Sequence, residues 1–273
     1  MTILFTGHRG FLGRELIPLL SQDFEIVTYD GDLVNHELLL NFIERNSISH
    51  VIHAAAKVSN RWETDTSDNL INNLKMTLNI VNLCLPVLTF CSGKVYGYQK
   101  SIDNVSENDA GKRYPDDFYG QGKYIIRKLI EDKSSVNLLR FFNVFGKSED
   151  SRKFIKANIL RYVNKEPMTV DQDIIYDFFY VNDALPLIRS WIQEKAIPKE
   201  LNLVYSQKMK LSDVCNLINA LGNHRVDIEI KESATGKNYY ANGTNLNDMH
   251  YSLLGLEKGL QQVYTYIVDN ERT

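Results

Sequence analysis

A tyrosine and a lysine one helical turn apart, with a serine upstream, are the clearest candidates for chemistry in this sequence. Tyr119 and Lys123 have the Tyr-x-x-x-Lys spacing, which places two side chains on the same face of a helix. A phenol with its ordinary pKa of about 10 is a weak base at neutral pH, but a nearby ammonium and a positively charged ring favour the phenolate. Such a phenol can exchange a proton with a substrate hydroxyl, while the Ser92 hydroxyl holds the reacting oxygen.

The Tyr-x-x-x-Lys spacing alone is weak evidence. It occurs at Tyr96/Lys100, Tyr119/Lys123 and Tyr124/Lys128. Context selects the second pair, because Tyr119 begins a predicted helix that follows the strand ending at Ser92, and open α/β sheets bind ligands at the carboxyl ends of their strands. Tyr124 lies further along that helix, where a packing role is simpler, and Tyr96 lies in a loop.

A glycine-bearing turn separates the first predicted strand from the first predicted helix. Gly7, Gly10 and Gly13 have a GxxGxxG spacing there, with Phe11 and Leu12 between them. Glycines permit a tight turn and the close approach of a pyrophosphate, which then binds N–H groups at the positive end of the helix dipole. The position of this turn at the start of a βαβ run predicts a dinucleotide site. The alternative is that the glycines serve packing alone.

Residues around the end of the second predicted strand bear on which dinucleotide binds. Asp30 can accept both hydroxyls of an adenosine ribose, which favours NAD because a 2′-phosphate would meet a negative charge. Arg9 can instead reach a 2′-phosphate, so NADP stays open, and its alternative is a solvated loop residue. Asp32 and Leu33 are candidates to flank the adenine ring, with a surface turn as the alternative.

The first half of the chain alternates short apolar runs with longer amphipathic segments, a pattern typical of βαβ units and a parallel sheet. Strands are predicted over residues 3–5, 25–29, 50–53, 87–91 and 136–141, and helices over 12–20, 36–45, 70–85 and 119–132. We therefore predict an α/β fold, with a Rossmann-type doubly wound parallel sheet and a smaller C-terminal α/β substrate lobe. Residues 1–146 form the dinucleotide-binding domain, with contributions from about 176–205, and residues 147–273 form most of the lobe.

The lobe shows looser alternation. Helices are predicted over residues 154–163, 182–193 and 211–221, with short strands between them, and residues 233–247 are interpreted as a polar connection.

Composition and charge argue against other classes of protein. The 31 Lys and Arg against 34 Asp and Glu give a formal net charge of −3, which disfavours a nucleic-acid binder. The three cysteines lie far apart and no histidine pair has the spacing of a helical metal site, so neither a disulfide framework nor a metal is predicted. The most apolar stretch is too short to span a membrane and no export signal is visible, so a cytoplasmic protein without membrane attachment is expected.

Together these residues resemble the extended short-chain dehydrogenase/reductase family, and within it the NAD-dependent epimerase/dehydratase group that modifies nucleotide sugars. The resemblance covers nearly the whole chain and depends on an ordered set of motifs. Beyond those already described, the set comprises residues 53–56, Asn72 and Asn73 with Thr77, and residues 95–97, 139–146, 177–183 and 256–260.

The resemblance implies roles for further residues. The backbone of Ala54, Ala55 and Ala56 would line the cofactor, as would Asn73, which orders the cleft. Tyr119 and Lys123 would also contact the cofactor, Lys123 at the nicotinamide ribose. Asn143 would reach the substrate's diphosphate, and its alternative is a turn asparagine at a strand end.

The resemblance also implies a homodimer. Related proteins pair two helices into a four-helix bundle, and the corresponding helices here cover residues 68–85 and 119–132. Both have broad apolar faces. The alternative is that these faces belong to an intramolecular core.

Two departures from the family narrow the reaction. Sugar 4,6-dehydratases of the family carry an Asp-Glu pair after the active-site hydroxyl, where this chain has Gly93 and Lys94, and this disfavours a dehydratase. The fucose synthase branch has a cysteine two residues after its serine. Lys94 stands there in this chain, which argues against the epimerising chemistry of that branch.

A third departure concerns the substrate. Many members hold a phosphate with an arginine where this chain has Tyr176, so either Arg152, Lys153 or Arg161 replaces that charge or the substrate is not a typical diphosphate sugar. The candidate substrate contacts are Ser92, Lys94, Asn143 and Tyr176.

The expected activity is NAD(P)-dependent oxidoreduction at a ring carbon of a nucleoside-diphosphate sugar, as a 4-epimerase or a 4-keto reductase. The alternatives are a reductase of a small non-nucleotide ketone and a dinucleotide-sensing protein without catalysis. The presence of Ser92, Tyr119 and Lys123 together disfavours a sensor.

Overall fold

The computed structural model describes residues 1–57, 65–231 and 236–271. Within these residues the largest sheet has six strands in the order β10-β6-β4-β3-β1-β2, and every neighbouring pair is parallel. The strands are β1 (Thr2–Thr6), β2 (Glu25–Thr28), β3 (Ile48–His53), β4 (Val87–Ser92), β6 (Val136–Phe141) and β10 (Glu200–Leu203). The chain reverses its direction across the sheet beside β1, which is where open α/β sheets bind ligands.

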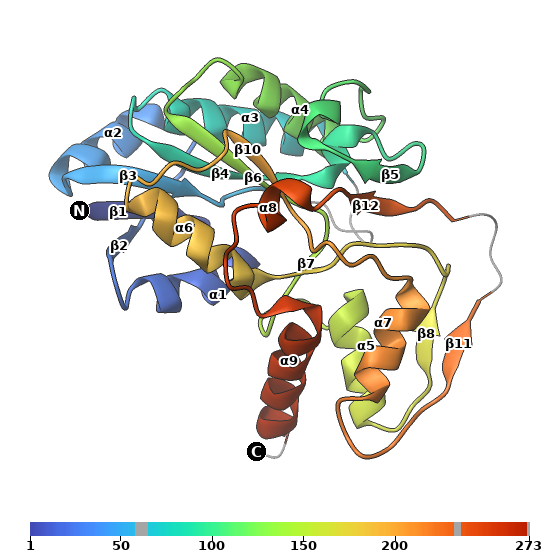
Figure 1. Ribbon diagram of the computed structural model, residues 1–273. Helices are drawn as coiled ribbons and strands as arrows, with labels where there is room; N and C mark the ends of the chain where they lie inside the picture. The colour runs from blue at the N-terminus through green and yellow to red at the C-terminus, as the bar shows by residue number, and fades with distance from the viewer. Residues whose placement is uncertain (58–64, 232–235, 272–273) are drawn as a thin grey trace.

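Helices cover both faces of this sheet because its central strands are apolar on both sides. Leu4, Val51 and Val87 pack beneath one layer of helices, whereas Phe5 and Leu88 pack beneath the other. The first layer contains α2 (His36–Arg45), α3 (Ser67–Val81) and α4 (Phe118–Ile130), and the second contains α1 (Phe11–Leu20) and α6 (Leu185–Ile192). Figure 1 shows the two layers with the sheet between them.

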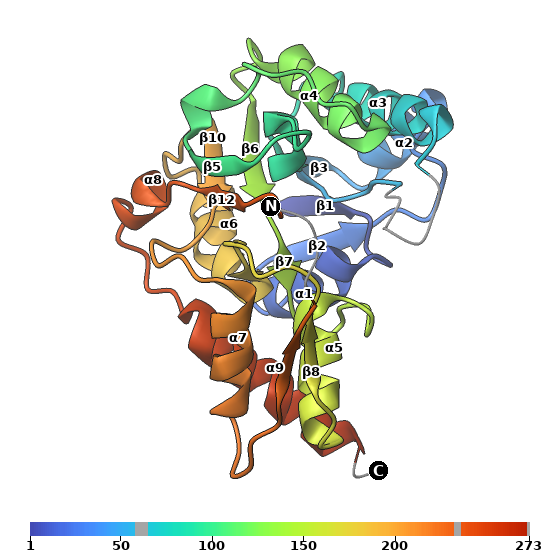
Figure 2. The same cartoon turned by 90° about the vertical axis from the view of Figure 1, so that its right-hand side faces the viewer.

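A smaller lobe is built around a separate apolar cluster that includes Ile155, Tyr162, Val214 and Leu260. Its elements are α5 (Phe154–Val163), α7 (Leu211–Asn219), α9 (Gly255–Glu271) and the parallel pair β8 (Met168–Val170) and β11 (Ile228–Ile230). Figure 2 shows α5, α7, α9 and β8 together below the main sheet.

Two short parallel pairs connect the sheet to the lobe. They are β7 (Val144–Phe145) with β9 (Phe179–Tyr180), and β5 (Ile102–Val105) with β12 (Tyr239–Ala241). The other short elements of the described residues are the 3-10 turns η1 (Gly93–Tyr96), η2 (Glu107–Asp109) and η3 (Val181–Ala184), and the short helix α8 (Thr244–Asn247). The chain therefore crosses between the two parts more than once.

The predicted α/β fold with a Rossmann-type parallel sheet is confirmed. Several element ends differ by one or two residues, and three differences are larger. The helix predicted to reach Leu85 ends at Val81, because Asn82 closes it and Cys84 adopts a left-handed φ of 57°. The helix predicted over residues 182–193 begins as the turn η3. The segment interpreted as a connection contains β12 and α8, while its residues 233–235 lie outside the described part. The division at residue 146 stays a prediction.

A buried arginine ties β6 to β10. Arg140 is fully buried, and its Nη2 donates to Glu200 Oε2 at 2.6 Å. Its Nη1 donates to Asn202 Oδ1 at 2.9 Å and to Tyr96 Oη at 3.1 Å. The network holds the late strand β10 against the sheet.

Replacing Glu200 tests this network. Glu200→Gln should lower the free energy of unfolding by about 3 kcal/mol, because it leaves the charge of Arg140 buried without a carboxylate. Urea denaturation measures the change. The control is Asp23→Asn, which breaks the exposed 2.8 Å pair with Arg189 and should cost less than about 1 kcal/mol. Equal losses of unfolding free energy in Glu200→Gln and Asp23→Asn would contradict the role given to the buried network of Arg140.

Candidate active site

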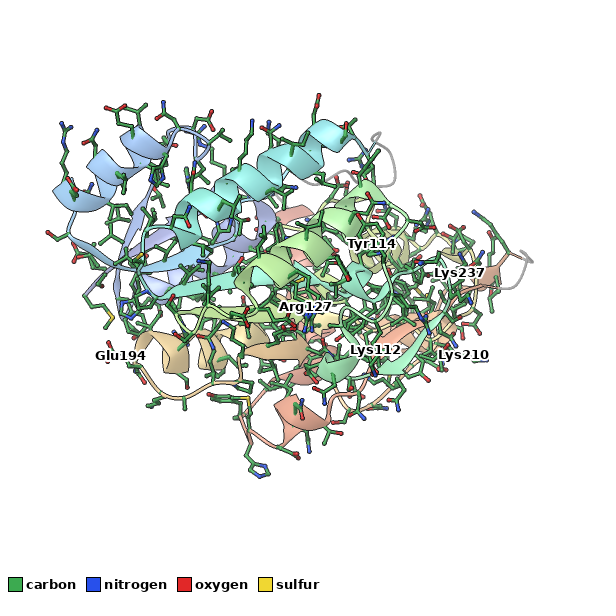
Figure 3. The ribbon with its side chains drawn as sticks, turned by 90° about the horizontal axis from the view of Figure 1, so that it is seen from above. Lys112, Tyr114, Arg127, Glu194, Lys210 and Lys237 are labelled. Carbon is green, nitrogen blue, oxygen red and sulfur yellow. The ribbon has the colours of Figure 1, made fainter. Side chains whose placement is uncertain are left out.

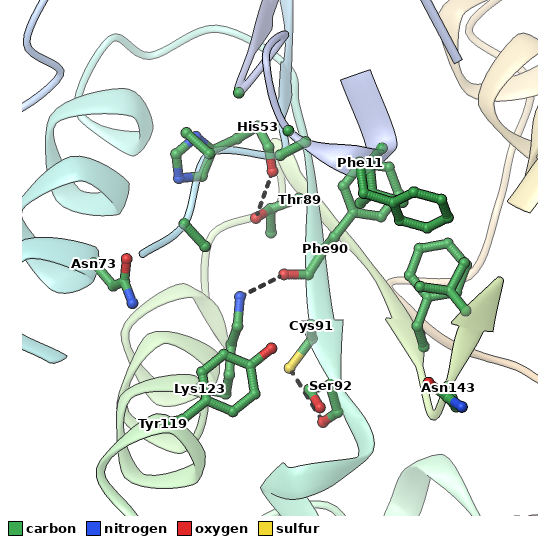
Figure 4. A pocket seen from close by; sticks show the side chains of 18 of the residues that line it. Phe11, His53, Asn73, Thr89, Phe90, Cys91, Ser92, Tyr119, Lys123 and Asn143 are labelled. Carbon is green, nitrogen blue, oxygen red and sulfur yellow. Dashed lines mark hydrogen bonds between the residues drawn. The ribbon is translucent and has the colours of Figure 1, made fainter. Parts of the chain in front are cut away.

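A cavity of about 820 Å³ lies over the carboxyl ends of β1, β3 and β4. Its lining includes the glycine turn, the three alanines after β3, the end of β4 and the first turns of α4. Figure 4 shows Ser92, Tyr119 and Lys123 around one end of this space, with Phe11 and His53 at the other. The cavity therefore joins the predicted dinucleotide turn to the predicted reacting groups.

The glycine turn has the form that a pyrophosphate requires. Gly7 has a φ of +77°, and a Cβ there would lie 2.6 Å from the backbone nitrogen of Ala55, so a side chain is excluded. The Gly10 N–H donates to Gly7 O at 3.0 Å, and α1 begins at Phe11 without a side-chain cap. The first N–H groups of α1 are thus available to an anion at the edge of the cavity. Gly13 does not line the cavity and packs against the backbone of His8, where a Cβ would lie 2.5 Å from His8 Cα.

Local hydrogen bonds place Tyr119 in the first turn of α4. Asp117 caps the helix by accepting the Gly120 N–H at 2.8 Å, and Asp65 accepts the Tyr119 N–H at 2.8 Å. The Tyr119 side chain lines the same cavity as Ser92, which ends β4. The structure therefore brings a helix start and a strand end together, as the sequence predicted.

Lys123 lies one turn further along α4 and faces the same cavity. Its Nζ donates to the Phe90 carbonyl oxygen at 3.0 Å and lies 5.8 Å from the centroid of the Tyr119 ring. Burial lowers the pKa of Lys123. The lysine is therefore held by the strand β4 as well as by its own helix.

Burial dominates the ionisation of Tyr119. It raises the pKa of Tyr119 above the ordinary 10, Cys91 and the carboxylates of Asp117 and Asp65 raise it further, and the hydrogen bond from Ser92 opposes the rise. Lys123 is not among the groups that shift the pKa of Tyr119, and its Nζ donates to the Phe90 carbonyl instead. That the lysine and a cofactor ring together favour the phenolate stays a prediction. The protein alone therefore keeps Tyr119 a neutral phenol at neutral pH.

His53 anchors the end of β3 beneath the cavity. Its Nδ1 lies 2.8 Å from Thr6 Oγ1 and its Nε2 lies 3.3 Å from Thr77 Oγ1. Burial and the nearby Lys123 lower the pKa of His53 to about 3. The ring is thus a neutral connection between β1, β3 and α3.

Asn73 fixes the chain that follows the alanine run. Its Oδ1 accepts the Lys57 N–H at 2.7 Å and its Nδ2 donates to Lys57 O at 2.8 Å. Asn73 and the residues Ala54, Ala55 and Ala56 all line the cavity. The amide thereby holds the segment that would face a cofactor.

Several predicted cofactor contacts lie outside the lining of this cavity. Asp30 accepts from Arg9 at 2.5 Å and lies 3.1 Å from the His8 ring nitrogen. Asp32 accepts the Val34 N–H at 2.9 Å, and Leu33 is buried in the core beneath α2 and α3. The Leu33 side chain is therefore directed into the core. The cofactor-binding roles of Arg9, Asp30, Asp32 and Leu33 stay predictions.

A second cavity of about 840 Å³ adjoins the first and shares Asn143 and Lys153 with it. Tyr176 and Phe178 contribute rings, and Arg152, Arg161 and Lys231 contribute cationic groups. Arg152 pairs with Asp150, and Lys231 pairs with Asp171. Arg152, Lys153 and Arg161, which the sequence offers as replacements for the arginine missing at position 176, thus all line the second cavity.

Lys94, a predicted substrate contact, lies outside the lining of both cavities. Its Nζ pairs with Asp117 at 3.4 Å and lies 4.9 Å from the centroid of the Tyr98 ring. Its backbone N–H donates to Ser92 Oγ at 3.3 Å. The structure therefore connects Lys94 to the site through its backbone.

The structure also places residues at the cavity that the sequence did not single out as ligand contacts. Glu149 is the most unusual, because burial raises its pKa to about 8 and its Oε2 has no hydrogen-bond partner among the described residues. Cys91, Phe142 and Thr77 also line the cavity. Thr77 follows Asn73 by one helical turn, a signal the sequence does contain, whereas no pattern marks Glu149.

Neither a metal site nor a membrane-spanning helix is found among the described residues. No group of three or more His, Cys, Asp or Glu side chains there could hold a metal ion. No helix in the same residues has the length and apolar character needed to cross a membrane.

The chain is similar to known proteins over most of its length. The model of the NAD dependent epimerase/dehydratase family matches residues 3–203. The GDP-6-deoxy-D-talose 4-dehydrogenase of Aggregatibacter actinomycetemcomitans is 25% identical over 250 residues, which cover 85% of this chain and 84% of that protein. The ADP-L-glycero-D-manno-heptose-6-epimerase of Brachyspira hyodysenteriae is 27% identical over 224 residues, 67% of this chain and 69% of that protein.

A solved structure shares the fold. The dTDP-glucose 4,6-dehydratase of Bacillus anthracis, in complex with NAD, superimposes with a TM-score of 0.82 at 18% identity and covers 100% of this chain and 98% of its own. Because a dehydratase has this fold, the fold gives no support to the expectation that excludes dehydration. That expectation depends on Gly93 and Lys94 alone.

The ionisation of His53 is directly measurable. The His53 ring should stay neutral between about pH 5 and pH 8. Nitrogen NMR of the histidine rings measures this, with the His53→Gln variant identifying the signals. The unfolded chain protonates His53 near its ordinary pKa of 6.5, so its contribution to stability is present above that pH and is lost as the pH falls toward about 3. A His53 signal that titrates near 6.5 would contradict this assignment.

Proposed function

The chain belongs to the NAD dependent epimerase/dehydratase family, as its motifs indicated, and we propose that it transfers hydride at carbon 4 of a nucleoside-diphosphate sugar. The proposal depends on one observation: Ser92, Tyr119 and Lys123 face a single cavity whose other end is a glycine turn that fits a pyrophosphate. The first relative is itself named for dehydrogenation at carbon 4 of a GDP-linked sugar.

Each part of the cavity holds a defined part of a nicotinamide dinucleotide. The turn at Gly7 and Gly10 and the first N–H groups of α1 bind the pyrophosphate. Lys123 lies beside Tyr119, where it contacts the nicotinamide ribose. When bound, the cofactor supplies the hydride acceptor and a positive ring. That charge is what a buried phenol needs for ionisation.

The protein's own groups move the proton. Tyr119 takes the proton of the sugar hydroxyl during oxidation and returns one to the ketone during reduction. Ser92 holds the reacting oxygen by a hydrogen bond. Ser92 is buried, whereas Tyr119 and Lys123 are part-exposed toward the cavity, so a bound cofactor and sugar would exclude water from these groups.

Asp30 favours NAD over NADP in this proposal. Its carboxylate follows β2, where it can accept the hydroxyls of the adenosine ribose. Arg9 lies against Asp30, so its charge is partly neutralised by that carboxylate instead of being free for a 2′-phosphate. NADP is the second candidate, because Arg9 is mostly exposed and can turn away from Asp30.

The second cavity receives the nucleotide of the substrate. Asn143 and Lys153 line both cavities, so a ligand that extends from Tyr119 passes them. A diphosphate there would meet the cations of Lys153 and Arg161, which replaces the arginine absent at position 176. Tyr176 and Phe178 offer rings at the same wall.

The proposed homodimer uses α3 and α4, which pack against one another and lie side by side in Figure 3. Four large apolar side chains of these helices are exposed: Ile71 (45%), Leu78 (36%), Phe118 (42%) and Leu129 (43%). Exposed apolar side chains gathered on neighbouring helices favour association with a second apolar face. A second copy of the chain offers such a face.

Substituting Tyr119 tests the chemistry. The wild-type protein should turn over at least one sugar in a panel of UDP, GDP, CDP and dTDP sugars with NAD or NADP. Tyr119→Phe should lose at least about 100-fold in turnover because the proton donor is gone, while cofactor affinity is retained. Absorbance of the nicotinamide and calorimetric titration measure the two quantities.

The control for Tyr119→Phe is Tyr124→Phe on the same helix. Tyr124 donates to Gly111 O at 3.4 Å and does not line the cavity, so its loss should leave turnover within about two-fold. A Tyr119→Phe protein with more than half of the parental rate would eliminate this phenol as the acid and base. NAD retained through purification would identify an epimerase, and stoichiometric consumption of NADH or NADPH a reductase.

Light scattering tests the dimer. The wild-type protein should have twice the chain mass of 31.4 kDa at micromolar concentration. Ile71→Glu combined with Leu129→Glu should give single chains, because each charge would be buried in the interface. Leu38→Glu on α2, where Leu38 is 55% exposed, should leave the dimer intact. A wild-type species of 31.4 kDa alone would contradict the proposal.

A further inference from the structure

Glu149 is a buried carboxyl group that the proposed mechanism does not use. It follows β7 in the chain and lines the cavity of about 820 Å³ that contains the glycine turn and Tyr119. Only 6% of the residue is exposed, and its Oε2 has no hydrogen-bond partner among the described residues. Because an unpaired polar group in a protein interior is costly, a buried carboxyl at a cavity wall indicates a contact with a ligand.

The loop that carries Glu149 is attached to α1, the helix that begins at the glycine turn. The Ser148 N–H donates to Glu15 Oε1, and Arg14 Nη2 donates to Ser148 O at 3.3 Å. The loop also packs closely on this helix, because a Cβ at Gly146 would lie 3.0 Å from Glu15 Cδ. Glu149 therefore lies at the wall of the cavity that adjoins α1, whose first N–H groups are available to a phosphate.

The loop is attached to the lobe as well, through backbone atoms. Lys156 of α5 donates from its Nζ to Lys147 O at 2.7 Å and to Glu149 O at 2.9 Å. Asp150, the next residue of the loop, pairs with Arg152 at 2.6 Å. Lys156 therefore holds the backbone on either side of Ser148 and is directed at carbonyl oxygens, not at the Glu149 carboxyl.

The surroundings of Glu149 favour its protonated form. Burial raises the pKa of Glu149 to about 8, against the opposing charges of Lys153 and Lys156, and Asp150 and Glu15 raise it further. A protonated carboxyl has an O–H to donate, whereas an ionised one only accepts. Phosphate oxygens are acceptors that carry negative charge, so the neutral acid binds them and the ionised form repels them.

We propose that Glu149 is a phosphate-binding residue, which stays protonated and donates a hydrogen bond to an oxygen of a bound diphosphate. The expected source is the pyrophosphate of the dinucleotide at the N-terminus of α1, so the inference rests on the proposed binding of that cofactor. Lys153 lines the same cavity and supplies a cation there. The bound diphosphate favours the neutral carboxyl further, so binding takes up a proton at any pH where the free protein has lost it.

Titrations with NADH test the proposal. The affinity of the wild-type protein for NADH should fall about ten-fold between pH 7 and pH 9, because Glu149 ionises in the free protein and not in the complex. Glu149→Gln keeps the shape of the side chain and offers an N–H that does not titrate. It should bind NADH as the wild type does at pH 7 and lose less than about two-fold by pH 9. The fluorescence of NADH measures both affinities.

Calorimetry in buffers with different heats of ionisation counts the protons. At about pH 8.5 Glu149→Gln should take up at least about 0.5 fewer protons per NADH than the wild type. Glu149→Leu, which has no donor, should bind NADH about 10-fold more weakly than the wild type at pH 7. The control is Glu229→Gln, an exposed position of β11 outside both cavities, which should behave as the wild type. Urea denaturation confirms that each variant is folded.

A second titration distinguishes the two sources of a diphosphate. The panel of UDP, GDP, CDP and dTDP sugars is titrated into the wild type and Glu149→Gln with NAD present. A pH dependence that needs Glu149 with NADH assigns the contact to the dinucleotide. The same dependence with a nucleotide sugar alone assigns it to the substrate. Affinities that vary with pH equally in the wild type and in folded Glu149→Gln, in both titrations, overturn the inference.

These measurements need no turnover, so the inference and the proposed function can fail separately. Proton uptake that depends on Glu149 in a protein that turns over no sugar supports the phosphate-binding role while the proposed function fails. Turnover with binding that is indifferent to Glu149 does the reverse. A wild-type protein that binds neither NADH nor any nucleotide sugar contradicts both.

Discussion

The parallel alignment of β1, β3 and β4 is the constraint on which the site depends. Parallel strands present their carboxyl ends at one edge, so Gly7, Ala54 and Ser92 meet although they are distant in sequence. The contact between Gly7 and the backbone of Ala54 and Ala55 is tight enough to exclude any Cβ. The same register that joins β1 to β3 therefore also shapes the glycine turn, and a register error would remove the fold and the site together.

Burial is the second determinant, and it acts against the charges that the chemistry needs. It raises the pKa of Tyr119 and lowers that of Lys123, so both groups move toward their neutral forms. The protein offsets this with neutral hydrogen bonds from the end of β4, through Ser92 to Tyr119 and through the Phe90 carbonyl to Lys123. A cationic group bound beside Tyr119 would favour the phenolate more strongly than it would in water, because charges interact more strongly where burial lowers the dielectric constant.

The sequence predicts the central sheet and its edge well because both depend on local patterns. Apolar runs identify β3, β4 and β6, and the glycine turn and the Tyr119/Lys123 spacing place groups at known ends of elements. Leu33 shows the limit of this reasoning, since a residue after a strand can be directed into the core as readily as toward a ligand. Glu149 was missed for a related reason. It lies in the loop after β7, where Ser148 is hydrogen-bonded to Arg14 and Glu15 of α1, and no local period marks such a contact between distant segments.

The seam between the sheet and the lobe forms the wall shared by the two cavities. Asn143 lies between β6 and β7, and its carbonyl oxygen accepts the Phe179 N–H at 2.8 Å, so the wall shared by the two cavities is also the point where the lobe is attached. Tyr176 extends this wall, because it lines the second cavity and packs on Tyr239. A nucleotide bound in the second cavity, as proposed, would contact Tyr176, which packs in turn on Phe178 and Tyr239. Binding of the remote part of a substrate would then order the wall shared by the two cavities without any movement of the central sheet.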